Sequence, residues 1–382
     1  MINEQVIKEI TYNYVISLKN QYNIQTLANY NYLRKYKKKE ILDILNLDVE
    51  SFCSKFDSSI TRDYVYKNDF FTPRNMVLIH PLYYLYYNYL VFLIAYDYLK
   101  VEEISFSKEK MSIFYSGKLI ITDNYNEIKN NARYLSSYSD YQETRQSYSN
   151  YPAINIDLKD FFNSIKIDCL LDKLYKRGIK TNLVNSLKYF FNHCKFYQLP
   201  QIHYSLGSSI LSQFYLLDFD EKISNLLITE NIHLIRYVDD MTLIILDGNS
   251  NIKKMNSIIN EISSYLWIDN LALNSAKTKI LTPEEYKKSI MLATTKYEHH
   301  HVFKSEKIID EKALDIIKNR KLVELIQDLC EIEKEKGVDL TEYNSLIQKK
   351  ISINGGEVGK ILNNILFSEK LNMIKVDDMY EC

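Results

Sequence analysis

Residues 232–246 read IHLIRYVDDMTLIIL, and two apolar runs meet there at the adjacent carboxylates of Asp239 and Asp240. Short apolar runs rich in Ile and Leu are typical of strands, and a brief polar break between two of them indicates a hairpin. At the tip of a hairpin, two neighbouring side chains can both leave the sheet edge. Taken alone, the pattern fits an ordinary Asp-containing turn equally well.

A further acidic residue follows a short apolar segment upstream. Residues 153–157 read AINID, begin after Pro152 and predict a strand that ends at Asp157. A carboxylate among apolar neighbours needs a partner, because charged side chains are rarely buried unless they are paired or bind metal. Carboxylates from separate segments are what two-metal phosphoryl transfer requires. Its two Mg²⁺ ions lie roughly 3.5–4 Å apart and act on the attacking and leaving oxygens.

The segments around these acids alternate in type. Predicted helices cover residues 168–177, 206–217 and 251–266, and a short predicted strand covers residues 277–281. The order strand–helix–helix–strand–strand–helix–strand predicts an α+β fold, with helices covering one face of a sheet.

In this order the segments resemble the motifs of the reverse transcriptase family. NIDLKDFFNSI (155–165) is similar to the first palm motif, and RYVDDMTLII (236–245) is similar to the YxDD hairpin. Residues 199–220 resemble the second motif, and LALN (271–274) with KTK (277–279) resembles the fourth. Upstream, TPRNMVLIHP (72–81) is similar to a fingers segment.

The resemblance implies a set of site residues. Asp157, Asp239 and Asp240 would be the catalytic metal ligands for two Mg²⁺ ions, with Mn²⁺ as the alternative ion. The implied nucleotide-binding residues are Phe162, Gln201, Lys277 and Arg74, and the implied template and primer contacts are Ser205, Gly207, Ser208 and Tyr237. Phe162 would disfavour a 2′-hydroxyl and so select deoxynucleotides. The alternatives are a core position for Phe162, a solvated side chain for Lys277, and Lys67 in place of Arg74.

The implied architecture is a right-handed polymerase fold with fingers, palm and helical thumb. Residues 1–55 would form an N-terminal helical segment, 56–150 the fingers, 151–285 the palm and 286–382 the thumb. Residues 75–96 contain no Asp, Glu, Lys or Arg, but their many tyrosines favour a buried aromatic helix over a membrane span. Residues 124–150, rich in Ser, Asn and Tyr, predict a loop-rich connection.

The second motif departs from the family pattern. Ile202 stands where Gly usually follows Pro-Gln, which predicts a different template contact. This departure and the lead-in YSDYQETRQSYSNYP (138–152) resemble bacterial abortive-infection and defence-associated reverse transcriptases. No protease, integrase, RNase H or zinc-finger endonuclease signature is visible, so we expect RNA-directed DNA synthesis in antiphage defence. Template-independent synthesis, protein-primed synthesis from a Tyr hydroxyl, and a non-catalytic nucleic-acid-binding scaffold are the alternatives.

Composition constrains the partners and the compartment. With 48 basic and 49 acidic residues, the net charge is −1, so nucleic acid must meet a local basic surface. Residues 34–39 are the candidate, and a solvated helix face is the alternative. Five cysteines without a CxxC pair, and no visible signal peptide, indicate the cytoplasm. Expected partners are an RNA template, a DNA product, deoxynucleoside triphosphates, and a non-coding RNA or protein encoded nearby. We expect no membrane contact, and the oligomeric state stays open.

Overall fold

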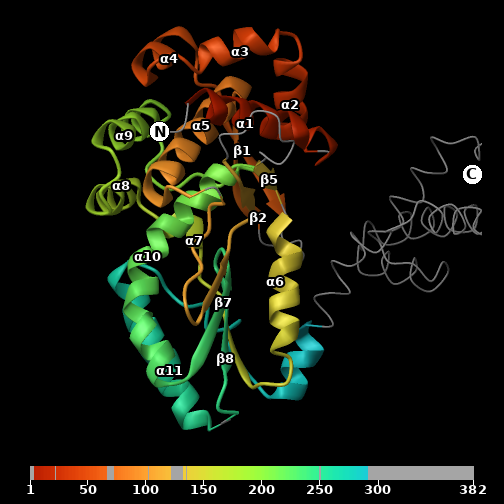
Figure 1. Ribbon diagram of the computed structural model, residues 1–382, viewed down its shortest axis with the longest axis vertical. Helices are drawn as coiled ribbons and strands as arrows, with labels where there is room; N and C mark the ends of the chain where they lie inside the picture. The colour runs from red at the N-terminus through yellow and green to blue at the C-terminus, as the bar shows by residue number, and fades with distance from the viewer. Residues whose placement is uncertain are drawn as a thin grey trace, which may run out of the picture. The chain divides into compact units, whose positions relative to one another are not determined.

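A mixed five-stranded sheet carries the predicted motifs in the computed structural model (Figure 1). Its order is β3-β7-β8-β6-β9, with β3 parallel to β7 and the other neighbours antiparallel. The strands are β3 (Met111–Phe114), β6 (Ala153–Ile156), β7 (Ile232–Tyr237), β8 (Asp240–Ile245) and β9 (Lys279–Leu281). Strands predicted at residues 153–157, 232–238, 241–246 and 277–281 are confirmed. β3 was not predicted, and it comes from the range assigned to the fingers.

The structure describes residues 4–21, 23–66, 73–101, 103–121, 132–134, 136–248 and 251–290. Those up to Lys287 belong to one compact unit. Lys67 and nearly all of the helical thumb predicted at residues 286–382 lie outside the described residues.

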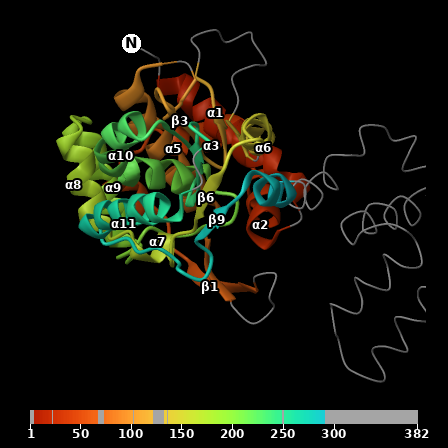
Figure 2. The same cartoon turned by 90° about the horizontal axis from the view of Figure 1, so that it is seen from below.

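Helices lie on both faces of the sheet, whereas the sequence predicted only one covered face. Neighbouring residues of a strand point to opposite faces. Arg236 of β7 contacts Gln213 and Asp220 of α10 (Leu206–Thr229), while the next residue, Tyr237, contacts rings of α6 (Ser136–Ser147). Figure 2 shows β6 and β9 between α10 and α11 (Ile252–Ile268) on one side and α6 on the other.

The helix α6 corrects the prediction of a loop-rich connection at residues 124–150. Its buried residues include Ser137, Tyr141 and Arg145, which recur every four positions and so form one helical face. The prediction was wrong because this buried face is polar and aromatic, so the composition resembles that of a loop. Tyr141 packs against Phe114 of β3 with ring centroids 5.9 Å apart.

The predicted buried aromatic helix is α5 (Pro81–Leu99), and most of its residues are buried. It begins at Pro81 because His80 caps it, and its ring nitrogen accepts from the Leu82 amide at 3.3 Å. Residues 75–79, which had been predicted as part of this helix, are therefore not helical. They belong to β2 (Pro73–Ile79), which pairs antiparallel with β1 (Ile60–Tyr66). No helix among the described residues is long and apolar enough to cross a membrane.

The N-terminal helices lie around α5. They are α1 (Glu4–Ser17), the short 3₁₀ helix η1 (Leu18–Gln21), α2 (Ile24–Leu33), α3 (Lys38–Ile44) and α4 (Val49–Lys55). Of these, α1 and α2 pack directly against α5. The Tyr14 hydroxyl of α1 donates to the Tyr204 carbonyl and accepts from the Leu206 amide at 3.0 Å. The N-terminal helices are therefore joined directly to the start of α10.

Three helices connect β6 to α10, namely α7 (Phe161–Ser164), α8 (Ile167–Lys176) and α9 (Thr181–His193). The helix predicted at residues 168–177 is confirmed as α8, and Gly178 ends it with a φ of +75°, which glycine adopts freely. The Lys173 ammonium lies 2.7 Å from carboxylate oxygens of both Asp218 and Asp269. These two ion pairs tie α8 to α10 and to the end of α11.

A second small sheet pairs β4 (Gly117–Leu119) with β5 (Ala132–Tyr134). A Cβ atom on Gly117 would lie 2.0 Å from the Arg133 carbonyl oxygen, so glycine is required for this approach. The Ser209 hydroxyl accepts from the Ser116 amide at 2.9 Å, which joins this region to α10.

Candidate active site

The ends of two strands bring the predicted carboxylates to one edge of the sheet. β6 ends at Ile156, which pairs with Met241 of β8, and Asp157 is the next residue. One further step of this antiparallel register places Asp157 opposite Asp240. Directly opposite residues on neighbouring strands have Cβ atoms about 4.5–5.5 Å apart. Acids that are distant in sequence therefore meet at the same edge.

Asp239 lies in the two-residue turn that joins β7 to β8. Tyr237 and Asp240 form the last pair of the ladder, so Val238 and Asp239 make the turn. Val238 has a φ of +55°, a left-handed conformation that costs a residue other than glycine about 1–3 kcal/mol. The Val238 amide donates to the Phe114 carbonyl of β3 at 3.0 Å, and its side chain is buried. These contacts hold a strained turn and set the direction in which Asp239 leaves the sheet.

The carboxylate of Asp157 is held by residues from the segment after α11. Asn274 donates from Nδ2 to Asp157 Oδ2 at 2.9 Å, and Lys277 Nζ lies 3.2 Å from Oδ1. The Asn274 amide also donates to the Asp157 carbonyl at 2.8 Å. The Lys277 side chain is 59% exposed and that of Asp157 is 19% exposed. The structure therefore brings Lys277 to the site, where it balances the charge of Asp157.

The donor chemistry of this edge fits a hard cation. Asp157, Asp239 and Asp240 offer carboxylate oxygens, which are the ligands that Mg²⁺ prefers. In the conformation described, Asp157 is occupied by Lys277 and Asn274. No group of three or more His, Cys, Asp or Glu side chains is gathered closely enough to hold a metal within the described part of the chain. Metal binding at these residues would therefore require Asp157 to exchange its lysine partner for the ion.

A family model described as "Reverse transcriptase (RNA-dependent DNA polymerase)" matches residues 98–308, more than half of the chain. The chain belongs to the reverse transcriptase family. A search of curated proteins gave no match.

Family membership has direct consequences for this reverse transcriptase. The matched region contains all five strands of the sheet, including β3, as well as α6. It supports a polymerase fold and nucleotidyltransferase activity, with nucleic acid and deoxynucleoside triphosphates as partners, and polymerases of this family generally use divalent metals. The match begins upstream of the range that the sequence analysis assigned to the palm.

The predicted nucleotide-binding residues lie on separate elements of the reverse transcriptase. Phe162 is half-buried on α7 and packs against Phe161 with ring centroids 5.4 Å apart. The Gln201 carbonyl accepts from the Val77 amide of β2 at 2.8 Å. Gln201 also lines a cavity of about 220 Å³, together with Arg62, Asn75, Asn163 and Tyr197. The backbone of Arg74 lies in β2, and its side chain is outside the described residues.

The predicted template contacts Ser205, Gly207 and Ser208 lie inside the protein instead. Ser205 caps α10 and accepts from the Ser208 amide at 3.3 Å, and the Ser208 hydroxyl donates to the Pro200 carbonyl at 2.7 Å. The Gly207 amide donates to Asn88 Oδ1 of α5 at 2.9 Å. All three residues are buried, so the structure places them in the packing of α5 against α10. Small residues are required there because the two helices approach closely.

Tyr237 lies beside the carboxylates, on the face of the sheet that α6 covers. Its ring is 5.2 Å from the rings of both Tyr138 and Tyr141. Burial raises the pKa of the Tyr141 phenol, and the carboxylate of Asp240 raises it further.

Several residues of this site, above all Asn274 and Arg236, were not predicted from the sequence. Asn274 ends the segment that resembles the fourth motif, and no role was predicted for it, although it holds Asp157 through two hydrogen bonds. Arg236 is fully buried directly before the Tyr237–Asp240 turn. A lone arginine in the apolar run IHLIRY was the available signal, because arginine is almost never buried without a partner.

Proposed function

We propose that this reverse transcriptase copies RNA into DNA by two-metal nucleotidyl transfer at the sheet edge carrying Asp157, Asp239 and Asp240. The observation that carries the proposal is the register of β6 on β8, which brings Asp157 beside the Asp239–Asp240 turn. In the proposed layout the five-stranded sheet belongs to the palm, the β1–β2 hairpin belongs to the fingers, and residues 286–382 supply the thumb.

In the proposed reaction the primer 3′-oxygen attacks the α-phosphorus of a deoxynucleoside triphosphate, and pyrophosphate leaves. Two Mg²⁺ or Mn²⁺ ions, when bound, would activate the attacking oxygen and stabilise charge on the leaving group. Asp157 and Asp239 would hold both ions, with Asp240 in support. Phe162 would lie beneath the sugar, while Gln201 would contact the nascent pair and Lys277 the triphosphate.

In the proposed reaction Lys277 leaves Asp157 and contacts the triphosphate. Replacing Lys277 with Met tests this exchange of partners. Since the ammonium competes with metal for Asp157, the variant should bind Mn²⁺ more tightly in a titration followed by electron paramagnetic resonance. The KM for the nucleotide should rise, because the phosphates lose a cation. Stability should change by less than about 1 kcal/mol, the usual value of an exposed ion pair. Lys279→Met, on neighbouring β9, is the control. Unchanged metal affinity and unchanged KM would show that Lys277 is a solvated lysine.

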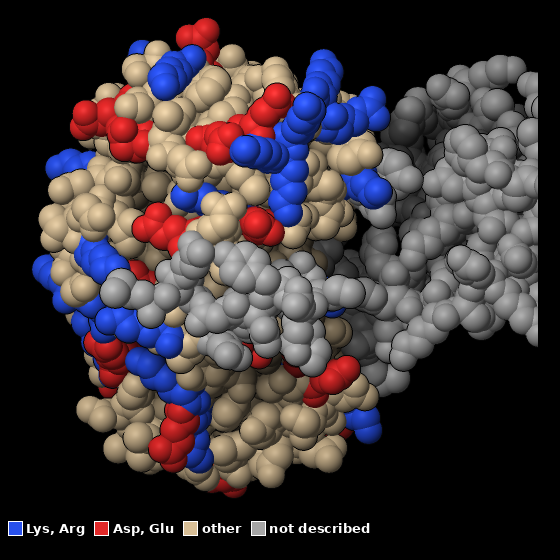
Figure 3. All heavy atoms as spheres, turned by 45° about the horizontal axis from the view of Figure 1, so that its top comes forward, with Lys and Arg blue, Asp and Glu red and all other residues tan. Residues whose placement is uncertain are grey.

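The basic run at residues 34–39 is the candidate surface for nucleic acid. Its four lysines and Arg34 are exposed, on the turn between α2 and α3 and on the first residues of α3. Figure 3 shows basic side chains gathered over the N-terminal helices. Among the described residues, its only ion pair joins Lys38 to Glu9, with 3.3 Å between Nζ and Oε2. Tyr36 lies within the run, is 45% exposed and contacts the ring of Tyr32. Cations interleaved with exposed rings suit a single-stranded nucleic acid.

Changing Lys35, Lys37 and Lys39 to Gln should therefore weaken RNA binding and reduce its salt dependence. Each phosphate contact contributes roughly −0.7 to the slope of log K against log salt for single strands, so the slope should become shallower by up to about 2. Fluorescence anisotropy with a labelled single-stranded RNA measures it. Lys176, Lys188 and Lys253, exposed on α8, α9 and α11, provide a triple Gln control. Equal slopes for both variants would assign the run to a solvated face.

Primer extension tests the proposed activity itself. The purified protein is supplied in Mg²⁺ with an RNA template and DNA primer, with a DNA template and primer, or with primer alone. The proposal expects products that follow the RNA sequence. Product made without template would indicate template-independent synthesis, and DNA covalently attached to the protein would indicate priming from a Tyr hydroxyl. RNA binding without any incorporation would indicate a non-catalytic scaffold. Sequencing the nucleic acid that copurifies with the protein identifies the natural template.

We also propose that the enzyme acts in bacterial antiphage defence. The support is the similarity of residues 138–152 and of the altered motif at Ile202 to defence-associated reverse transcriptases. Cells that express the protein with its neighbouring genes are challenged with a panel of phages. Protection should disappear in Asp239→Ala and Asp240→Ala variants that still accumulate to normal levels. Protection that survives both changes would favour a binding role.

A further inference from the structure

Arg236 is fully buried, on the face of β7 that packs against α10. Burying a guanidinium costs hydration that only charge pairing and hydrogen bonds can replace. Its position is notable, because the next residues along the chain are Tyr237, Val238 and the carboxylates Asp239 and Asp240. A buried cation therefore sits directly behind the turn of the proposed active site.

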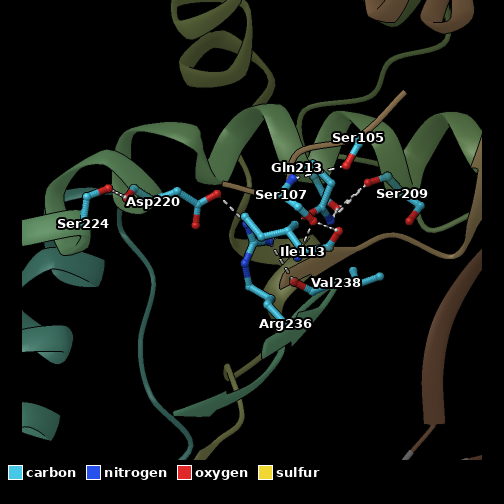
Figure 4. Close-up of polar contacts among 10 residues, drawn as sticks. Ser105, Ser107, Ile113, Ser209, Gln213, Asp220, Ser224, Arg236 and Val238 are labelled. Carbon is cyan, nitrogen blue, oxygen red and sulfur yellow. Dashed lines mark hydrogen bonds and ion pairs between the residues drawn. The ribbon is translucent and has the colours of Figure 1, made fainter. Parts of the chain in front are cut away.

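The guanidinium is bound from two sides (Figure 4). Nη2 lies 2.5 Å from Oδ2 of the fully buried Asp220, and Nη1 donates to Gln213 Oε1 at 2.6 Å. The amide nitrogen of Gln213 contacts the Ser209 carbonyl at 3.4 Å and the Ser212 hydroxyl at 3.2 Å, which fixes Oε1 toward the arginine. Gln213 and Asp220 are seven residues apart, so they lie on one face of α10 two turns from each other.

The same guanidinium reaches the turn. Nη1 donates to the Val238 carbonyl at 3.2 Å, and that carbonyl belongs to the peptide bond that leads into Asp239. Val238 adopts a left-handed conformation that a β-branched residue does not favour, so an external contact is needed to maintain it. The chain of contacts from α10 through Arg236 to Val238 supplies that contact.

Within the described part of the chain, the Arg236–Asp220 ion pair leaves polar atoms of both side chains unsatisfied, so stability alone does not account for it. Among the described residues, Arg236 Nε and Asp220 Oδ1 are buried without a hydrogen-bond partner. Burial lowers the pKa of the Arg236 guanidinium, while Asp220 and Asp239 raise it, so both carboxylates favour its charged form. A hydrophobic pair of similar volume would fill this space without unsatisfied polar atoms. The Arg236–Asp220 pair also supplies a donor to the Val238 carbonyl, which points to a role in placing the turn.

We propose that Arg236 is a positioning residue, anchored by Asp220 and Gln213, that holds the Val238 carbonyl and thereby aims Asp239 at the metal site. The expected effect on kcat rests on the proposed polymerase function. The contact by which Arg236 holds the Val238 turn does not depend on it. Arg236 touches neither nucleotide nor template in this assignment. It acts through the backbone of the turn.

The test compares breaking the pair with replacing it. Arg236→Met leaves Asp220 buried and unpaired, so its melting temperature should fall. Arg236→Met with Asp220→Leu replaces the pair by apolar side chains and should recover most of the melting temperature. Because the Val238 carbonyl still lacks its donor, kcat should remain about 10- to 100-fold below the wild type, the equivalent of one hydrogen bond to a charged group. The nucleotide KM should change little.

The Lys173–Asp269 pair provides a matched control, because it is also a buried ion pair but joins α8 to the end of α11. None of its hydrogen bonds within the described part of the chain reaches Val238. Lys173→Met should lower the melting temperature while kcat per folded molecule is retained. Gln213→Leu serves as a milder second variant that keeps the Arg236–Asp220 pair. It should lower kcat with a smaller loss of melting temperature than Arg236→Met.

Hydrogen exchange of the Val238 amide, which donates to Phe114 at 3.0 Å, gives a readout that needs no activity. The amide should exchange faster in the double variant than in the wild type, even though the melting temperature has recovered. Recovery of both kcat and Val238 protection in the double variant would overturn the proposal. If the wild type polymerises nothing while Val238 protection still depends on Arg236, the proposed function fails and the positioning role stands.

Discussion

Asp239→Ala is expected to remove nucleotide incorporation almost completely, by about 10³-fold or more, and to leave the fold intact. A metal ligand shared by both ions contributes several kcal/mol to the transition state, and each 1.36 kcal/mol corresponds to a tenfold change in rate. Single-nucleotide incorporation in Mg²⁺, under single-turnover conditions, measures the loss. Comparable rates for the variant and the wild type would refute the assignment of the site.

The fold should tolerate this change because Asp239 lies in the turn and not in the ladder. Tyr237 pairs with Asp240 on either side of it, and Val238 is held by Phe114 and Arg236. Asp247→Ala is a suitable control, because Asp247 is an exposed acid just beyond the other end of β8. It should retain full incorporation, and both variants should keep the wild-type melting temperature within a few degrees.

Phe162→Ala is expected to admit ribonucleotides, with a fall of about 10- to 200-fold in the preference for deoxynucleotides. This is the range of discrimination that close packing around one small group provides. Phe162 is half-buried on α7, five residues beyond Asp157, so part of its ring remains available to a sugar. The ratio of kcat/KM for a deoxynucleotide and its ribonucleotide, measured on one template, reports the change.

Phe161→Ala is the matched control for this prediction. Phe161 is buried and packs against Phe162, so removing its ring should cost about 3–5 kcal/mol of stability. Its sugar preference should stay that of the wild type. If Phe162→Ala instead loses stability with unchanged sugar preference, then Phe162 is a core residue like its neighbour.

The sequence by itself determined the local elements of the site. The apolar runs on either side of Asp239 and Asp240 predicted β7 and β8, and the short run before Asp157 predicted β6. These elements were predictable because strand formation depends on apolar pattern and turn residues within a few positions. The resemblance of the same segments to reverse transcriptase motifs identified the family.

Long-range pairing lay beyond the sequence pattern. β3 joins the sheet only through its parallel ladder with β7, and no local signal in residues 111–114 indicates that partner. The helix α6 was taken for a loop because its buried face carries Ser137 and Arg145 beside Tyr141. Burial of a polar side chain depends on what packs against it, and composition does not record the partner.

Only the tertiary structure decided the roles of individual residues around the carboxylates. Ser205 and Ser208, expected to contact the template, are buried where α5 packs against α10. Lys277 and Asn274 both contact the carboxylate of Asp157. Arg236 is buried and contacts both Asp220 of α10 and the Val238 carbonyl of the turn. The sequence gives the side chains that are present, whereas the distances between them and their burial determine the free energies of their interactions. Both are set when segments distant in sequence pack together.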